Sequence, residues 1–422
     1  MAEARIPVGW AGVRAGIVAL LLLLACSCSA RTGQESAPVP EHLLLVNATV
    51  IDGRGGPVLP GGYVLIGRGM ILAVGQGRPG RVPEGCRQVQ ARGMTVLPGL
   101  IDAHNHVLLS PAEERCEYLA RGVTTLGNVG SAMEDIPLLL RDDGCRRVWS
   151  GPALSLPGGY PGPLHGRRYA LEVGSEAQAR AAVGRLQAGG AEMIKVSLEP
   201  GPPNADWPVM DRKMLTAIVQ EAHARGMTVR AHVEQGRYLS RALASGVDTI
   251  EHVPLPKNAL QAEEWAGQIA ASGVVLVPTL EAGSRAVWDN CPLLDFVHRV
   301  HERGGRVGLG TDAPFKGVAP GLPLEEMELL QRAGLSPLEV ITAATVHAAA
   351  ACGIGDRVGT LEPGKAADLM LVRGDPLKDL TALRDVALVV RSGEVVYSRP
   401  AFIEDLLFGS TSKSLVEALP GP

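Results

Sequence analysis

The sequence predicts an α/β protein in which a (β/α)8 barrel is inserted into a small β-sandwich domain built from both chain ends. Three observations lead to this fold class. At 422 residues the chain exceeds a usual single domain. Apolar strands alternate with amphipathic helices between residues 98 and 356. Short strands broken by glycine turns occur on both sides of that region.

The first 30 residues have the pattern of a targeting segment. Arg5 and Arg14 precede an apolar run, Ala15–Ala25. This run is shorter than the ~20 residues that span a bilayer and has the length of a signal-peptide core. It ends in Leu23-Leu24-Ala25-Cys26, which resembles the bacterial lipobox. That resemblance implies cleavage before Cys26 and lipidation of this cysteine.

We therefore expect a lipoprotein-type signal peptide over 1–25 and a tether rich in Ser, Thr, Gly and Pro over 26–41. An ordinary signal peptide cut near Ala30, or a short membrane anchor, remains open. The expected location is the bacterial periplasm or cell envelope, with a lipid anchor as the membrane contact.

The predicted β-sandwich domain comprises residues 42–97 and 357–400. Its N-terminal strands are expected at Leu43–Val50, Gly62–Ile66, Met70–Val74, Cys86–Gln90 and Met94–Val96. The same pattern returns at Asp368–Val372 and Val386–Tyr397, where Ser392-Gly393 forms a turn. One domain split by a long insertion explains why both ends look alike.

The insertion, residues 98–356, is the predicted catalytic barrel. Its strands are expected at Leu97–Ala103, Val123–Leu126, Ala153–Leu156, Glu192–Ser197, Thr228–His232, Thr249–His252, Val274–Pro278 and Arg306–Gly310. Helices are expected between most of them, including Ser175–Ala188, Arg212–Arg225 and Asn258–Ala271. Eight strands within about 250 residues suit a (β/α)8 barrel. A doubly wound sheet is the alternative, but no glycine-rich dinucleotide loop follows the first strand. Residues 401–422 form a C-terminal tail, either a closing strap or a frayed end.

Charge and cysteine content exclude several classes of protein. The net charge is −4, with basic and acidic residues interspersed, so we expect neither a nucleic acid nor another polyanion as partner. Apart from Cys26, the cysteines show no CxxC spacing, which indicates neither a disulfide framework nor a zinc ribbon. A homo-oligomer is compatible with this composition.

Metal-competent side chains follow the predicted barrel strands. His104 and His106 end the first strand on one side, because side chains in a strand alternate with period two. Neutral imidazole is the commonest protein metal ligand. Further candidates end later strands: Lys195, His232, His252 and Asp312. Each alone has a structural explanation, but the carboxyl ends of barrel strands form the active site, so six together indicate a metal centre.

Lys195 is unusual among these candidates because it lies in the apolar strand Met193-Ile194-Lys195-Val196. Burial disfavours the charged ammonium and lowers its pKa. A neutral amine can react with carbon dioxide to give a carbamate, whose two oxygens can bridge two metals. A lysine that extends to the barrel mouth, or pairs with a carboxylate, is the structural alternative.

With these residues in place, the chain resembles the amidohydrolase superfamily, in the branch that holds imidazolonepropionase-like and prolidase-like enzymes. The motifs are Leu97-Pro-Gly-Leu-Ile-Asp-Ala-His-Asn-His106, Ile194-Lys195, Ala231-His232, Ile250-Glu-His252, Gly310-Thr-Asp312, Arg357-Val-Gly-Thr-Leu-Glu-Pro-Gly-Lys-Ala-Ala-Asp-Leu369 and Gly374-Asp-Pro376. They occur in the family's order and cover roughly residues 43–400.

The resemblance implies two divalent ions, for which zinc suits the nitrogen and carboxylate ligands. His104, His106 and Asp312 would hold one ion, His232 and His252 the other, and a carboxylated Lys195 would bridge them. A metal-bound hydroxide would attack the scissile carbonyl, and Asp312 would pass the proton to the leaving nitrogen.

Three features depart from the commoner family pattern: Asn105 between the first two histidines, Val233-Glu234 after His232, and Val253-Pro254 after His252. We expect all three at the pocket rim, where they affect substrate choice.

The candidate substrate contacts are fewer. The loop Gly158-Gly-Tyr-Pro-Gly-Pro-Leu-His165 resembles the family's glycine-rich loop, which ends in a substrate-contacting histidine. Arg230 and Glu234 share the face of His232 by period two. Arg230 is either an interior ion pair or a clamp for a substrate carboxylate.

The sequence thus predicts a metal-dependent amidohydrolase that cleaves the carbon–nitrogen bond of a small amide or short peptide. By resemblance, Xaa-Pro dipeptides and N-acyl amino acids are candidate substrates. Two alternatives remain open: a mononuclear cyclic-amide hydrolase or deaminase of the imidazolonepropionase type, with Lys195 unmodified, and a non-catalytic lipid-anchored binding protein.

Overall fold

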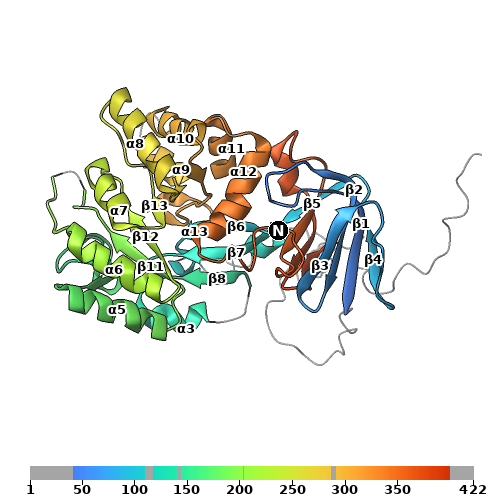
Figure 1. The fold of residues 1–422 in the computed structure, drawn as a ribbon, viewed down its shortest axis with the longest axis horizontal. Helices are drawn as coiled ribbons and strands as arrows, with labels where there is room; N and C mark the ends of the chain where they lie inside the picture. The colour runs from blue at the N-terminus through green and yellow to red at the C-terminus, as the bar shows by residue number, and fades with distance from the viewer. Residues whose placement is uncertain (1–40, 110–116, 141–143, 203, 287–290, 400–422) are drawn as a thin grey trace, which may run out of the picture. The chain divides into compact units, whose positions relative to one another are not determined.

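The computed structural model describes residues 41–109, 117–140, 144–202, 204–286 and 291–399 (Figure 1). The predicted signal peptide, the lipidation site Cys26, nearly all of the tether and the tail 401–422 lie outside these residues. Within them, no helix combines the length and apolar character needed to cross a membrane.

Strands from both ends of the chain form one mixed sheet. The first five are β1 (His42–Val50), β2 (Leu59–Gly67), β3 (Met70–Gln76), β4 (Arg87–Gln90) and β5 (Met94–Pro98), and the last three are β16 (Leu369–Arg373), β17 (Val386–Arg391) and β18 (Glu394–Ser398). Their order is β18-β17-β16-β5-β1-β2-β3, with β4 also paired to β1.

The two chain ends meet at the antiparallel pair β5–β16, where Val96 lies opposite Leu371. The blue and red strands accordingly lie side by side in Figure 1. Both residues belong to one buried apolar cluster of this sheet. A β module built from both ends is therefore present as one hydrogen-bonded sheet, whereas its description as a two-layer sandwich stays a prediction.

The inserted region contains two parallel sheets. One holds β6 (Leu100–Asn105), β7 (Val123–Asn128) and β8 (Arg146–Trp149) in that order. The other has the order β10-β9-β11-β12-β13-β14-β15 and consists of β9 (Ala153–Ser155), β10 (Ala170–Glu172), β11 (Met193–Ser197), β12 (Thr228–His232), β13 (Thr249–Glu251), β14 (Val275–Val277) and β15 (Arg306–Val307).

Backbone hydrogen bonds connect the two parallel sheets in two places. Ala103 N donates to Leu309 O at 3.0 Å, beyond the end of β15, and Glu192 N donates to Trp149 O at 3.1 Å, at the end of β8. The ladder of paired strands is nevertheless interrupted, so a fully closed eight-stranded barrel stays a prediction.

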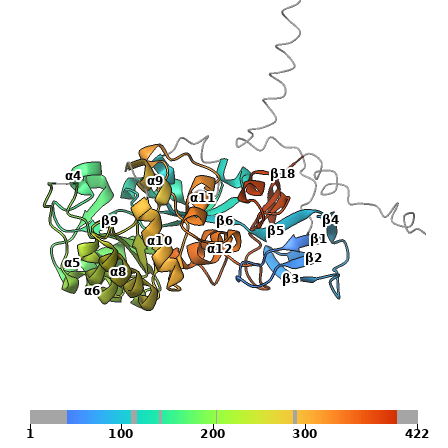
Figure 2. The same ribbon diagram turned by 90° about the horizontal axis from the view of Figure 1, so that it is seen from above.

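Helices follow most of the parallel strands and cover their outer faces (Figures 1 and 2). The longest predicted ones are confirmed as α5 (Glu176–Ala188), α6 (Arg212–Ala224) and α8 (Ala259–Ser272), each with a side-chain cap from the preceding residue. The others are α3 (Ile136–Leu139), α4 (Gly162–His165), α7 (Leu239–Ser245), α9 (Leu280–Ala286), α10 (Cys291–Glu302), α11 (Leu324–Arg332), α12 (Pro337–Thr342) and α13 (Ala348–Ala351).

The predicted first barrel strand, Leu97–Ala103, is wrong as a single element. The chain leaves the mixed sheet at Pro98, and β6 begins at Leu100. Gly99 connects the two strands. A Cβ at this position would lie 2.3 Å from Thr124 Oγ1, so no larger residue fits. The prediction also lacked β8 and β10: β8 opens with two arginines, and β10 has only three residues.

Candidate metal centre

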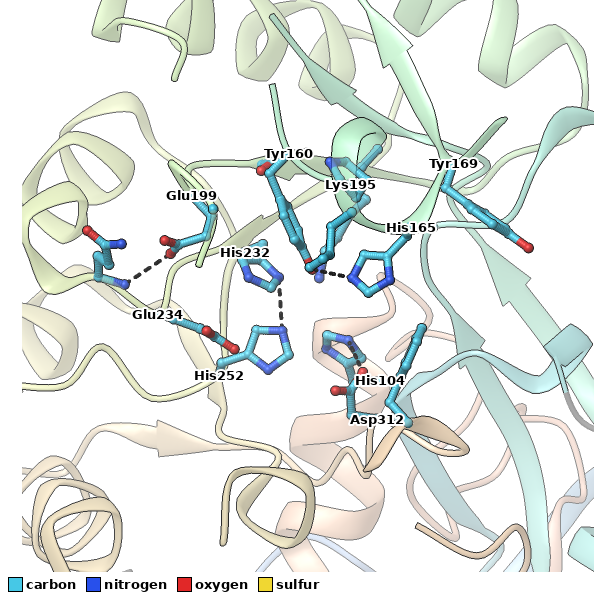
Figure 3. A pocket seen from close by; sticks show the side chains of 18 of the residues that line it. His104, Tyr160, His165, Tyr169, Lys195, Glu199, His232, Glu234, His252 and Asp312 are labelled. Carbon is cyan, nitrogen blue, oxygen red and sulfur yellow. Dashed lines mark hydrogen bonds and ion pairs between the residues drawn. The ribbon is translucent and has the colours of Figure 1, made fainter. Parts of the chain in front are cut away.

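A pocket of about 1240 Å³ lies at the carboxyl ends of the parallel strands (Figure 3). It is larger than the roughly 300–1,000 Å³ of common ligand sites. All six predicted metal ligands line it, together with two of the three predicted substrate contacts: His104, His106, Lys195, His232, His252, Asp312, His165 and Glu234. The structure thus brings together residues that are up to 208 positions apart, from His104 to Asp312.

The first cluster consists of His104, His106 and Asp312. Asp312 Oδ1 lies 3.3 Å from His104 Nε2 and 3.1 Å from His106 Nε2. Backbone bonds hold this geometry, because Asp312 N donates to His104 O at 2.8 Å and His106 N donates to Ala313 O at 2.8 Å. The end of β6 and the chain after β15 are therefore fixed against each other where three possible metal donors converge.

A buried carboxylate, Asp102, supports this cluster from behind. It accepts bonds from Thr311 N at 3.0 Å and Thr311 Oγ1 at 2.7 Å. It also accepts bonds from His104 N at 3.3 Å and from Asn105 Nδ2 at 2.9 Å, and the same Nδ2 contacts the Tyr118 hydroxyl at 2.8 Å. Asn105 is fully buried and does not line the pocket, so its predicted place at the rim is wrong. Its role is to position the strand that carries both histidines.

The second cluster consists of His232, His252 and Glu234, whose ligand atoms lie within 4.8 Å of one another. His252 Nε2 is 3.0 Å from His232 Nδ1, while the Nδ1 atom of His252 bonds the Thr279 hydroxyl at 2.8 Å. Burial holds the pKa of both imidazoles well below their usual value. They are therefore neutral at physiological pH, which is the form that binds metals.

Lys195 lines the same pocket and is only 5% exposed. Its Nζ atom has no hydrogen-bond partner in the described part of the chain. Burial lowers the pKa of its ammonium to about 8, although the nearby Glu251 carboxylate acts in the opposite direction. A buried amine without a partner is costly for a structural lysine. An unpartnered buried amine in this pocket instead fits a lysine that is modified or that contacts a bound group.

Glu251 is a buried charge beneath the pocket, and its role was not predicted from the sequence. Its Oε1 accepts a bond from Arg230 Nε at 2.7 Å, and its Oε2 contacts His104 Nδ1. Burial would raise the pKa of this carboxyl, but Arg230 and His104 hold it well below its usual range. The contact to Nδ1 leaves His104 Nε2 facing Asp312. Carboxylates that bond the far nitrogen of a metal-bound histidine orient its ring in the same way.

Arg230 does not contact the pocket. Its side chain is fully buried and paired with Glu251, so its predicted role as a carboxylate clamp for substrate is wrong and the interior ion pair is correct. The alternation of side chains along β12 correctly predicted that Arg230 and His232 share one face of the strand. Arg230, however, lies deeper in the interior than His232 and does not reach the pocket.

The donors present fit divalent metal ions. Each cluster offers two imidazole nitrogens and one carboxylate oxygen, a mixture that suits zinc. The unpartnered Lys195 amine adds the possibility of a bridging ligand.

Aromatic side chains close one side of the pocket. The Tyr160 hydroxyl lies 3.2 Å from His165 Nε2, and its ring lies 4.8 Å from that of His232 between centroids. Burial raises the pKa of Tyr160 above its usual value, so the phenol stays protonated. Phe315 packs against both His106 and His165. Tyr160 was part of the predicted loop, but nothing in the sequence identified its contact with His232.

A second carboxylate, Glu199, lies near Glu234 at the opposite side of the pocket (Figure 3). It accepts a bond from Gln235 N at 3.2 Å. Burial, reinforced by the charge of Glu234, raises the pKa of Glu199 to about 7.

Comparison with known proteins gives concordant matches. The profile of the Amidohydrolase family matches residues 95–396. An imidazolonepropionase from Salinispora arenicola is 27% identical over 374 residues, which covers 78% of this chain and 90% of the relative.

Two solved structures resemble nearly all of the described chain. A proposed prolidase from Bifidobacterium longum is 30% identical with a TM-score of 0.71, covering 88% of this chain and 99% of its own. An Xaa-Pro dipeptidase with bound methionine has a TM-score of 0.72 at 24% identity, covering 85% and 100%. This second likeness concerns the fold, which is an α/β fold like that of TIM barrels.

The buried Glu251–Arg230 pair generates a stability prediction. Glu251→Ala should lower the free energy of unfolding by about 3–5 kcal/mol, because it leaves Arg230 buried and unpaired. Urea unfolding measures the change. In the matched control Glu117→Ala, the exposed pair with Arg121 is lost, and the change should stay within about 1 kcal/mol. Equal small losses in both variants would contradict the central role of Glu251.

Proposed function

The chain belongs to the amidohydrolase family, and we propose that it is a binuclear zinc enzyme that hydrolyses an amide bond. Membership in this family makes it a metal-dependent hydrolase acting on carbon–nitrogen bonds. The proposal includes two metal ions, a bridge between them and an amide substrate. It also includes closure of the two parallel sheets into one (β/α)8 barrel beside a β-sandwich.

The observation that carries the proposal is the Lys195 amine. It is buried in the middle of β11, lines the pocket that holds both groups of metal donors, and lacks any hydrogen-bond partner among the described residues. A lysine kept for stability would have a carboxylate or carbonyl partner at this depth. Its lowered pKa makes the neutral amine accessible, which is the form that carbon dioxide converts to a carbamate with release of a proton.

In this assignment His104, His106 and Asp312 would hold one ion, His232 and His252 would hold the other, and a carboxylated Lys195 would supply a ligand to both. When bound, such ions supply Lewis acidity and lower the pKa of a water molecule toward ~7. Glu251 and Thr279 orient the ring nitrogens of His104 and His252 by contacting their opposite nitrogens.

The remaining chemistry falls to side chains of the chain itself. Asp312 is placed to accept a proton from the attacking water and to return it to the leaving nitrogen, as a general base and then acid. The protonated Tyr160 hydroxyl lines the same pocket and can donate a hydrogen bond to the substrate carbonyl oxygen. His165 and Tyr160 hold each other in this position.

For the substrate, we propose an N-acyl amino acid or an Xaa-Pro dipeptide. The Bifidobacterium longum neighbour is described as a prolidase, which supports a dipeptide. The pocket exceeds what a dipeptide needs, and Leu164, Leu255, Trp265 and Phe315 line it, which favours a bulky apolar acyl group.

A second candidate is a mononuclear hydrolase of cyclic amides. The Salinispora arenicola relative supports it because that protein is an imidazolonepropionase. In this case Lys195 would remain unmodified. The third possibility, a binding protein without turnover, does not explain why Asp312 lies between two histidines.

The proposed location is the cell envelope, with Cys26 as the lipidated residue. The support is the lipobox-like Leu23-Leu24-Ala25-Cys26 after an apolar run.

Hydrolysis assays test the proposed function. With zinc and bicarbonate supplied, the purified protein should cleave N-acyl amino acids or Xaa-Pro dipeptides. Lys195→Ala and Asp312→Asn should each lower kcat/KM by about 10²-fold or more, because a bridge or a proton carrier is lost. In the matched control Asp295→Asn, an exposed carboxylate of α10 changes and activity should persist. Full activity of Lys195→Ala would rule out the bridge, and turnover of cyclic amides alone would favour the mononuclear enzyme.

The lowered pKa of Lys195 also predicts how the rate of carbamate formation in metal-stripped protein depends on pH. With zinc present and dissolved carbon dioxide held constant, the rate of carbamate formation should rise with pH up to the lysine pKa, about 8, and then level off. The sign follows because only the neutral amine reacts, and its fraction grows until the pKa is passed. A ¹³C-labelled carbamate signal in NMR spectra reports the reaction, and Lys195→Ala should show none. A rate that falls as pH rises in this range would contradict the account.

A further inference from the structure

We propose that Glu234 is a further ligand of the ion held by His232 and His252. It would bind this ion beside the two histidines and the proposed carbamate of Lys195. This inference rests on the proposed metal centre and adds a ligand to it. The sequence placed Glu234 among the substrate contacts, and it does line the pocket. Its position relative to the two histidines indicates a different role.

The geometry is the first argument. A carboxylate oxygen of Glu234 lies within 4.8 Å of a ring nitrogen of both His232 and His252. Figure 3 shows the Glu234 carboxylate beside His252, on the side away from Asp312. Each cluster therefore has the same composition, two imidazoles and one carboxylate. Asp312 completes the first cluster, and Glu234 occupies the corresponding place in the second.

The loop that carries Glu234 is anchored on three sides. Leu255 N donates to Glu234 O at 3.2 Å, which attaches the loop to the chain that follows His252. Val233 N donates to Glu251 O at 3.3 Å, and Gln235 N donates to Glu199 Oε2 at 3.2 Å. Glu199 is thus a positioning residue for this loop.

Gly236, in the same loop, shows how closely the loop is packed. A Cβ on Gly236 would lie 1.8 Å from the Trp265 ring, so only glycine fits there. The loop backbone is therefore closely packed at Gly236, and the Glu234 side chain itself is exposed to solvent beside the two buried histidines.

Charge is the second argument. Within the described residues, no ion pair or side-chain hydrogen bond engages the Glu234 carboxylate. Desolvation in the pocket raises the pKa of this carboxyl, and the charge of Lys316 opposes the rise. Two divalent ions carry four positive charges, and Asp312, a carbamate and a hydroxide offset three of them. A carboxylate from Glu234 would offset the fourth and make the site neutral.

Metal affinity tests the inference without relying on activity. In chelator competition with zinc, Glu234→Gln should lower the binding affinity for one of the two ions by about tenfold or more and leave the affinity for the other nearly unchanged. Glutamine keeps the shape of the side chain and removes the anionic donor. In the matched control Asp135→Asn, a carboxylate of the same pocket that pairs with Arg168 at 2.9 Å is neutralised, and both affinities should persist.

Cobalt substitution separates a ligand from a nearby charge. If Glu234 coordinates, the visible absorption of the cobalt protein should change in position or intensity in Glu234→Gln but not in Asp135→Asn. A weaker affinity with an unchanged spectrum would show a distant charge effect and overturn the inference. The inference would also be overturned if wild type and Glu234→Gln bound two ions with equal affinity. That result would leave the proposed function intact. Absence of any bound ion in the wild type would overturn both.

Discussion

The carboxylate of Glu251, buried between His104 and Arg230, is the interaction on which both halves of the site depend. It connects three elements, because Glu251 ends β13, Arg230 lies in β12 and His104 lies in β6. A charge at this depth is stable only when its partners are in place, and removing either partner leaves an uncompensated ion. The residue that follows Glu251 is His252, so the backbone that carries this pair also positions the second cluster.

Polar side chains continue from this buried pair up to the pocket. Arg230 and Glu251 form a closed charge pair below, the neutral imidazoles and the partnerless Lys195 amine form the next layer, and Asp312, Glu234 and Glu199 surround the open volume above. Burial keeps the pKa of His232 and His252 low, which keeps their ring nitrogens available as donors. The site is therefore rich in electron-pair donors, which is what a pair of divalent ions requires, and Arg237, Lys257 and Lys316 also line the pocket. The same arrangement would be repulsive without a positive charge between Asp312 and Glu234.

The sequence predicted the strand-end residues because period two and the carboxyl-end rule are local and topological properties. It placed Lys195, His232, His252 and Asp312 at the pocket, and all four line it. It could not predict contacts that depend on depth: Arg230 and His232 share a face of β12, yet one is sealed below the other. The requirement for glycine at position 99 was also hidden, because it comes from the Thr124 side chain of a neighbouring strand. Tyr160 and Glu251 were visible in the motifs, but only the three-dimensional structure shows which histidines they contact.

The central claim is that two ions occupy this pocket and that Lys195 bridges them. The most direct test is elemental analysis of the purified protein prepared with zinc and bicarbonate, counting bound metal per chain. The account predicts about two ions per chain in the presence of bicarbonate and a lower content when carbon dioxide is excluded during reconstitution. About one ion per chain, independent of carbon dioxide, would contradict the bridge and make Lys195 a structural residue.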